Sequence, residues 1–296
     1  MLPMVPSNLD LEDEENFLKY VYQMQQFRKQ QENSYKYLQE MCQVKNVYPS
    51  YAGQVSPLTN RAIFIIDKLN SLNIKYTLDI FTERATDVVD YFNPKLINII
   101  VEFNSHLTEE PATMFCAHHD VVNVNSDNAQ DNSASVCNLL FLCKEIKAIE
   151  NFNKRVIVIF TDREEYGGVG AKRMSDKIND GIYNTVGKIY NLELTGLGDL
   201  LWIDTNNFKA NKTNTAFDFL KENMAERELL EVSTPFSDAV IFRREGLDAV
   251  CIGILPEEDR NSKSTWRLCH STGDTFEKTN EQNMVSFVQE VLLKLI

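Results

Sequence analysis

Two patterns of apolar residues alternate along the chain from about residue 57 onward. Nearly continuous apolar runs, of which RVIVIFT is the clearest, are typical of strands that are covered on both faces of a sheet. Longer stretches with apolar residues at helical spacing lie between them. Strands are expected at 75–81, 97–103, 112–118, 155–161, 186–194, 200–205 and 248–255. Helices are expected at 57–72, 133–149, 168–178, 213–227, 236–244 and 281–295.

Strands that alternate with helices predict an α/β fold. We expect a single domain with a mostly parallel central sheet, helices on both faces and an N-terminal helical extension. Because crossovers between parallel strands are right-handed, the carboxyl ends of the strands meet at one rim, where such sheets bind ligands.

The N-terminal part of the chain has a different composition. Residues 12–44 are polar, with Phe17, Leu18, Val21, Met24 and Phe27 at helical spacing, which predicts one long amphipathic helix. The segment 46–60 is rich in Pro, Gly and Ser and is expected to be a loop. We therefore predict a helical extension at 1–50, packed on a body at 51–296. The same helix could instead mediate dimerisation.

Charge and apolar run lengths exclude several kinds of partner. The formal net charge is −13, from 43 acidic and 30 basic residues, which argues against binding of nucleic acid. No apolar run approaches the roughly 20 residues that span a bilayer, so no membrane partner is expected. The first 17 residues lack a basic region, and we expect no secretory signal there.

The six cysteines have no CxxC or CxxxC spacing. Four of them lie inside apolar runs, at 116, 137, 143 and 251. We interpret the cysteines as free thiols in a reducing compartment and expect a cytoplasmic protein. In an exported chain, Cys251 and Cys269 could pair.

Residues that can bind metals or transfer protons lie at or near the ends of several predicted strands. Three of the four histidines belong to this set. The candidates are His118, His119, Asp120, Asp131, Glu164, Glu165, Glu193 and His270.

Imidazole and carboxylate groups together suit Zn²⁺, and one zinc ion takes three or four ligands. The candidates exceed that number, which indicates two zinc ions sharing one carboxylate. Asp131 is the expected bridge, because it opens the helix at 133–149, whose N-terminal dipole favours negative charge. Neighbouring glutamates on a turn can point in different directions, so Glu165 could bind a metal while Glu164 stays free as a general base.

Only one of two neighbouring histidines on an extended segment can face the metals. Asp120 lies two residues beyond His118, on the same side, and could hold the His118 ring by a hydrogen bond. His118 is therefore the expected ligand, and His119 is expected at the solvent or the rim.

The order of these motifs resembles that of a known enzyme superfamily. Over about residues 95–296, the order of motifs resembles that of the zinc-dependent exopeptidases. The motifs are HxD, Asp-Asn-Ser-Ala at a helix start, Glu-Glu, an acid in an apolar strand and His-Ser-x-x-Asp-Thr. The resemblance is strongest to the dinuclear zinc aminopeptidase branch, which includes the glutaminyl cyclases. Only 77 residues separate Glu193 from His270, which leaves no room for the dimerisation domain that related carboxypeptidases and deacylases insert there.

The resemblance implies that residues 51–296 form a catalytic domain that hydrolyses N-terminal peptide bonds of peptides or aminoacyl compounds. It implies two zinc ions per chain and a cis peptide bond after Asp131. It also implies a role for each candidate residue. His118 and Glu193 would bind one zinc ion, Glu165 and His270 would bind the other, and Asp131 would bridge them. Glu164 would be the general base, and Asp120 would orient His118.

Three departures from the family pattern bear on specificity, and one of them is the short loop from His118 to Asp131. Glu193 stands where aminopeptidases of this type usually have Asp, and Ala239 stands where His is common, which predicts an altered pocket wall. A glutaminyl cyclase with one zinc ion and a non-catalytic binding protein on the same fold are the alternative functions. The sequence specifies neither the preferred substrate side chain, nor the native metal, nor the oligomeric state.

Overall fold

The computed structural model describes residues 32–296 apart from 52–53, 57, 83–94, 184, 205–214, 235 and 266. Most of the helix predicted at 12–44 lies outside the described residues. Its described part contains α2 (Ser34–Met41), which begins where the Asn33 side chain accepts a hydrogen bond from the backbone N–H of Lys36. Within the described residues, no helix combines the length and apolar character needed to cross a bilayer.

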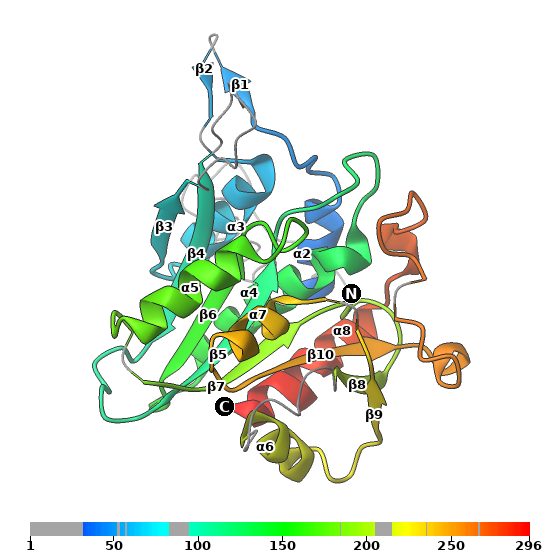
Figure 1. Cartoon of the computed structure of the whole chain (residues 1–296). Coiled ribbons are helices and arrows are strands. Elements are labelled where there is room, and N and C mark those ends of the chain that lie inside the picture. The colour runs from blue at the N-terminus through cyan, green and yellow to red at the C-terminus, as the bar shows by residue number, and fades with distance from the viewer. Residues whose placement is uncertain are drawn as a thin grey trace, which may run out of the picture.

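Eight strands form one mixed sheet whose central part is parallel (Figure 1). The order across the sheet is β3-β4-β6-β5-β7-β10-β8-β9. The pairs β6/β5, β5/β7, β7/β10 and β8/β9 are parallel, and the other three pairs are antiparallel. The strands are β3 (Thr77–Phe81), β4 (Leu96–Phe103), β5 (Ala112–His118), β6 (Val156–Thr161), β7 (Val186–Leu192), β8 (Leu200–Asp204), β9 (Leu229–Val232) and β10 (Ala249–Leu255).

Helices cover both faces of this sheet, which confirms the predicted fold class. One face packs against α2, α3 (Asn60–Ser71), α4 (Ala134–Ala148), α6 (Thr215–Asn223) and the C-terminal helix. The other face packs against α5 (Val169–Asn179) and α7 (Asp238–Arg244), which lie in front of the sheet in Figure 1. The C-terminal helix begins as α8 (Glu281–Ser286) and continues through a π turn (Phe287–Val291) into a 3-10 turn (Leu292–Leu295).

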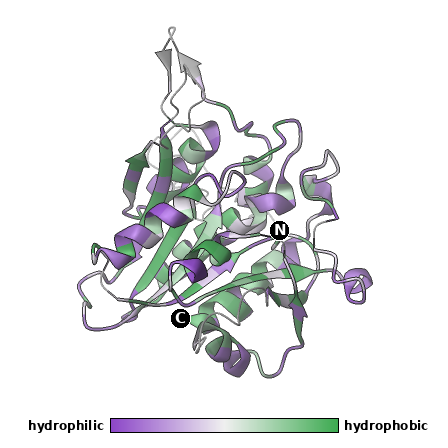
Figure 2. Ribbon diagram, viewed as in Figure 1, coloured by the Kyte–Doolittle hydropathy of each residue, from purple (hydrophilic) through white to green (hydrophobic). Residues whose placement is uncertain are grey.

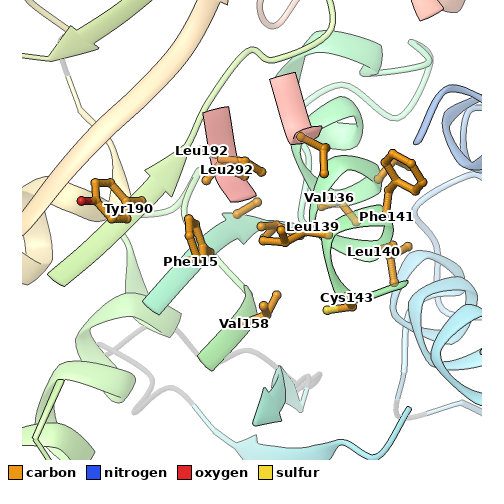
Figure 3. Packing of buried hydrophobic residues seen from close by; sticks show 14 of the residues in the cluster. Phe115, Val136, Leu139, Leu140, Phe141, Cys143, Val158, Tyr190, Leu192 and Leu292 are labelled. Atoms are coloured by element: carbon orange, nitrogen blue, oxygen red, sulfur yellow. The ribbon is translucent and has the colours of Figure 1, made fainter. Parts of the chain in front are cut away.

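Alternating side chains of the central strands enter the two cores. Phe115 and Ala117 of β5 face the core under α4, whereas Met114 and Cys116 face the core under α5 and α7. Figure 2 shows hydrophobic residues concentrated on the central strands, with hydrophilic residues on the outer sides of the helices. In Figure 3, Phe115 lies beside Tyr190 of the next strand, and their ring centroids are 5.5 Å apart. The strands that carry the candidate site are therefore rigidly supported on both sides.

All seven predicted strands are present, with bounds that differ by a few residues. The pattern missed β9 and a short hairpin, β1 (Ser50–Tyr51) with β2 (Gln54–Val55), inside the predicted loop. Each of these elements has four residues or fewer, too short to show a period. In α3, Ile63 and Ile66 are half-buried, whereas Arg61 is fully buried.

All six cysteines are free thiols, and the four in apolar runs are buried, as predicted. Cys251 and Cys269 are both free thiols, so the alternative disulfide between them is not formed.

A buried ion pair attaches α7 to the sheet. Nη2 of Arg243, in the last turn of α7, lies 2.8 Å from Oδ2 of Asp204, at the end of β8, and both side chains are almost fully buried. The same carboxylate accepts a hydrogen bond from the backbone N–H of Thr234. The exposed pair Lys172–Asp176 is shorter, at 2.5 Å, but is surrounded by solvent.

We expect Asp204→Asn to lower the free energy of unfolding by about 3–5 kcal/mol, because it leaves the Arg243 charge buried without its carboxylate. Asp176→Asn should cost only about 0–1 kcal/mol, because water screens the exposed pair. Chemical denaturation of both variants measures this. Equal losses would show that α7 is not held by the buried pair.

Candidate metal centre

The carboxyl ends of β5, β6 and β7 meet at one edge of the sheet. His118 is the last residue of β5, the Glu164–Glu165 turn follows β6, and Glu193 directly follows β7. Two loops complete the cluster, the turn before α4 and the loop before α8. The structure brings six of the candidate side chains together there: His118, Asp131, Glu164, Glu165, Glu193 and His270.

The two carboxylate oxygens of Asp131 face two different pairs of side chains. Oδ1 lies 3.2 Å from Nε2 of His118, and that nitrogen lies 3.5 Å from Oε2 of Glu193. Oδ2 lies 3.3 Å from Nε2 of His270, and that nitrogen lies 2.9 Å from Oε2 of Glu165. We call His118 with Glu193 the first half-site and Glu165 with His270 the second half-site. Asp131 is shared by both.

The turn that carries Asp131 is fixed by its own backbone and by its neighbours. The Asp131–Asn132 peptide bond is cis, as the sequence resemblance implied. Nδ2 of Asn132 donates to the carbonyl oxygen of Leu192, at the end of β7, over 2.8 Å. The carboxylate of Asp274 accepts hydrogen bonds from the backbone N–H groups of Gln130 (2.7 Å) and Asp131 (3.1 Å). Asp131 is thereby tied both to the strand of Glu193 and to the loop of His270.

Asp120 connects His118 to the turn of the two glutamates. Its Oδ1 lies 3.3 Å from Nδ1 of His118, on the opposite side of the ring from Asp131. Oδ1 also accepts a hydrogen bond from the backbone N–H of Glu164, and Oδ2 accepts one from that of Glu165. One carboxylate therefore orients the imidazole and positions both glutamates.

The prediction that His119 lies at the solvent or the rim is wrong. His119 is buried, and its Nε2 lies 3.0 Å from the carbonyl oxygen of Ile97 in β4. Neighbouring residues of an extended segment point to opposite sides, and the His119 ring points away from the cluster to β4, which lies beyond β6 in the sheet. Ala239, which stands where His is common, is fully buried in the core under α7, and the altered pocket wall stays a prediction.

Arg61 and Asp274 are parts of this centre that the sequence reading missed. Nε of Arg61 donates to the carbonyl oxygen of His119, and Nη2 donates to Oγ of Ser133. Each donor–acceptor distance is 2.9 Å. A fully buried guanidinium from α3 thus joins the end of β5 to the start of α4. Asp274 is the acid of the His-Ser-x-x-Asp-Thr motif, for which the sequence predicted no role of its own. Its spacing from His270 was the available clue, whereas no periodic signal distinguished Arg61.

Backbone strain also gathers at this edge. Arg163, Leu194 and His270 have positive φ angles of 62°, 58° and 58°, values that residues other than glycine seldom adopt. Arg163 directly precedes Glu164, and Leu194 directly follows Glu193. Three of the loops that carry candidate residues therefore contain a residue in the left-handed region.

The electrostatics show an excess of carboxylates. Burial alone would lower the pKa of His118, but the charge of Glu193 and hydrogen bonds to three carboxylates raise it well above 6.5. A hydrogen bond to Asp131 and the charge of Glu165 raise the pKa of half-exposed His270 to about 9. Burial and the charge of Asp131 raise the pKa of Glu165 to about 7. Burial also raises the pKa of Asp131, but hydrogen bonds from both histidines outweigh it and lower that pKa.

The donor set fits a divalent cation. His118, Asp131 and Glu165 each offer a ligand atom, and these atoms lie within 4.8 Å of one another. Oε1 of Glu165 is buried and has no hydrogen-bond partner among the described residues, so a polar atom points into the cluster unsatisfied. The cluster lines a cavity of about 340 Å³ together with Gly167 and Phe236. Imidazole nitrogen with carboxylate oxygen is a ligand set that zinc prefers.

We expect the metal-free protein to become less stable as the pH rises from about 6 to 9. The pKa of Glu165 rises from 4.5 to about 7 on folding, and that of His270 rises from 6.5 to about 9. In this window the folded state binds more protons than the unfolded state, so the free energy of unfolding falls as pH rises.

Melting temperatures of chelator-treated protein across this range measure the effect. The double variant Glu165→Gln/His270→Gln should show a weaker pH dependence. A wild-type melting temperature that increases from pH 6 to 9 would contradict the electrostatic description.

Comparison with known proteins supplies a family match. The model of peptidase family M28 matches residues 98–295. No curated protein sequence matches the chain significantly.

Several solved structures share the fold at low sequence identity. A glutaminyl cyclase from Porphyromonas gingivalis matches with a TM-score of 0.69 at 15% identity, over 89% of this chain and 96% of that chain. The LapA aminopeptidase from Legionella pneumophila matches with a TM-score of 0.66 at 14% identity, over 89% of this chain and 70% of that chain. BSAP, a zinc aminopeptidase from Bacillus subtilis, matches with a TM-score of 0.57 at 18% identity, over 69% of this chain and 50% of that chain.

Proposed function

The chain belongs to peptidase family M28, and on this premise we propose that it is a zinc-dependent aminopeptidase that holds two zinc ions. One observation carries the proposal. The two oxygens of Asp131 face two separate half-sites, each with one histidine and one glutamate. A single ion would leave one half-site without a cation.

The residues that would hold the ions follow from this geometry. His118 and Glu193 would hold one ion, Glu165 and His270 the other, and Asp131 would be shared. When bound, the zinc ions would polarise the peptide carbonyl and acidify a water molecule.

Glu164 is the proposed general base. It is buried beside the first half-site, with Oε2 4.0 Å from Nε2 of His118, and it belongs to neither half-site. Its carboxylate would take a proton from the attacking water and deliver it to the leaving amine. In the metal-free protein, burial and the charges of Glu193, Asp238 and Asp131 raise the pKa of Glu164 well above 4.5, although His118 lowers it.

The cavity supports a substrate with a free N-terminus. Its polar wall carries four carboxylates, which attract the α-ammonium group of a peptide or an aminoacyl compound. Phe236 adds an apolar wall for a substrate side chain. The free cysteines support a reducing location such as the cytoplasm.

A glutaminyl cyclase is the second candidate. The matched region covers 96% of the Porphyromonas gingivalis glutaminyl cyclase but only 50% of the Bacillus subtilis aminopeptidase. In that reaction an N-terminal amine attacks within its own molecule, and we expect one zinc ion to be enough.

We expect Glu164→Gln to keep both zinc ions and to lower kcat by a factor of about 10²–10⁴, because the amide cannot accept the proton. Steady-state kinetics with elemental analysis measure both quantities. Glu222→Gln, an exposed change on α6, is the control and should leave kcat unchanged. Loss of zinc in Glu164→Gln would mean that base and ligand roles are misassigned.

The zinc content of the purified protein, together with activity on a panel of substrates, distinguishes the aminopeptidase from the glutaminyl cyclase. We expect two zinc ions per chain and release of the N-terminal residue from aminoacyl chromogenic substrates, abolished by chelator and restored by zinc. One zinc ion per chain, with cyclisation of N-terminal glutamine and no aminoacyl hydrolysis, would identify a glutaminyl cyclase instead.

A further inference from the structure

A buried asparagine contacts the ligand carboxylate of the first half-site. Asn191 lies two residues before Glu193, so both side chains point to the same side of the strand. Nδ2 of Asn191 donates a hydrogen bond to Oε1 of Glu193 over 3.1 Å. Asn191 is fully buried, and Glu193 is 2% exposed, so water does not replace this bond.

A second bond determines which way the Asn191 amide points. The backbone N–H of Ala239, in the first turn of α7, donates to Oδ1 of Asn191 over 3.1 Å. Reversing the amide would bring an NH₂ group against this N–H and a carbonyl oxygen against the Glu193 carboxylate. Both contacts would be repulsive, so the donor end is fixed toward Glu193.

Because of this hydrogen bond, the two carboxylate oxygens of Glu193 have different roles. Oε1 is occupied by Asn191, and Oε2 faces the cluster, 3.5 Å from Nε2 of His118. Glutamate has one more side-chain torsion than aspartate, and an unheld glutamate would lose more conformational freedom on binding an ion. The hydrogen bond from Asn191 restricts the Glu193 side chain before an ion binds.

Helix α7 provides a firm support for this arrangement. Thr161, at the end of β6, donates a hydrogen bond to Oδ2 of Asp238 at the start of α7, and Arg243 pairs with Asp204 at the other end. The Ala239 N–H therefore has a fixed position relative to the strands of the site.

We propose that Asn191 is a positioning residue that orients Glu193 and sets the metal affinity of the first half-site, leaving the second half-site unaffected. The proposal rests on the proposed function, because it requires that the cluster bind zinc. It does not depend on whether the enzyme hydrolyses or cyclises its substrate.

Zinc titration of the metal-free protein against a competing chelator tests this. In Asn191→Ala, one of the two zinc ions should bind about 10–100-fold more weakly, and the other should bind as in the wild type. Asn191→Leu fills the space that Ala leaves and should give the same selective loss, which guards against a folding defect. In the double variant Asn191→Ala/Glu193→Ala, zinc binding should equal that of Glu193→Ala alone.

Asn98 offers a matched control. It is fully buried in β4, donates to the carbonyl oxygen of Gly170 and accepts from the backbone N–H of Asp162, and bonds to no side chain of the cluster. Asn98→Ala should leave both zinc affinities unchanged.

Three results would overturn the inference: unchanged affinities in both Asn191 variants, an equal loss at both half-sites, or an additional loss in the double variant beyond Glu193→Ala. Wild-type protein that takes up no zinc would instead refute the proposed function itself.

Discussion

The concentration of carboxylates at one edge of the sheet is the constraint on which the rest of the site depends. Asp120, Asp131, Glu164, Glu165 and Glu193 are crowded there, with His118 and His270 as the nearest cationic groups. Such a group is costly to bury unless cations and hydrogen-bond donors compensate it. The backbone donors to Asp120 and the raised pKa values of the two histidines both serve this compensation.

The parts that follow from local patterns could be predicted from the sequence. Apolar runs gave the strands, and the strand ends gave His118 and the Glu164–Glu165 turn, because parallel strands share an edge. The motif order over about 95–296 indicated the family, and the match over 98–295 confirms that resemblance. His270 was harder, since a loop histidine carries no periodic signal of its own. It was identified only through its neighbours in CHSTGDT.

The parts that depend on tertiary contact could not be predicted. The burial of His119 depends on β4, which lies two strands from β5 with β6 between them, and neither strand's own sequence specifies this order. The orientation of Asn191 toward Glu193 depends on the backbone N–H of Ala239 in α7, which is far from β7 in the chain. An arginine in an amphipathic helix ordinarily faces solvent, and only the contact of Arg61 with two distant elements reverses that expectation.

The position of Arg61 in the chain has a consequence for where this enzyme unit begins. The family match starts at residue 98, and Arg61 precedes it by more than thirty positions. A shortened protein that started at the match would still encode all five residues assigned to the two half-sites. It would leave the carbonyl of His119 and the hydroxyl of Ser133 without their shared donor, directly behind His118 and Asp131. Helix α3 is thus a component of the centre, and a boundary drawn from the family match alone would remove it.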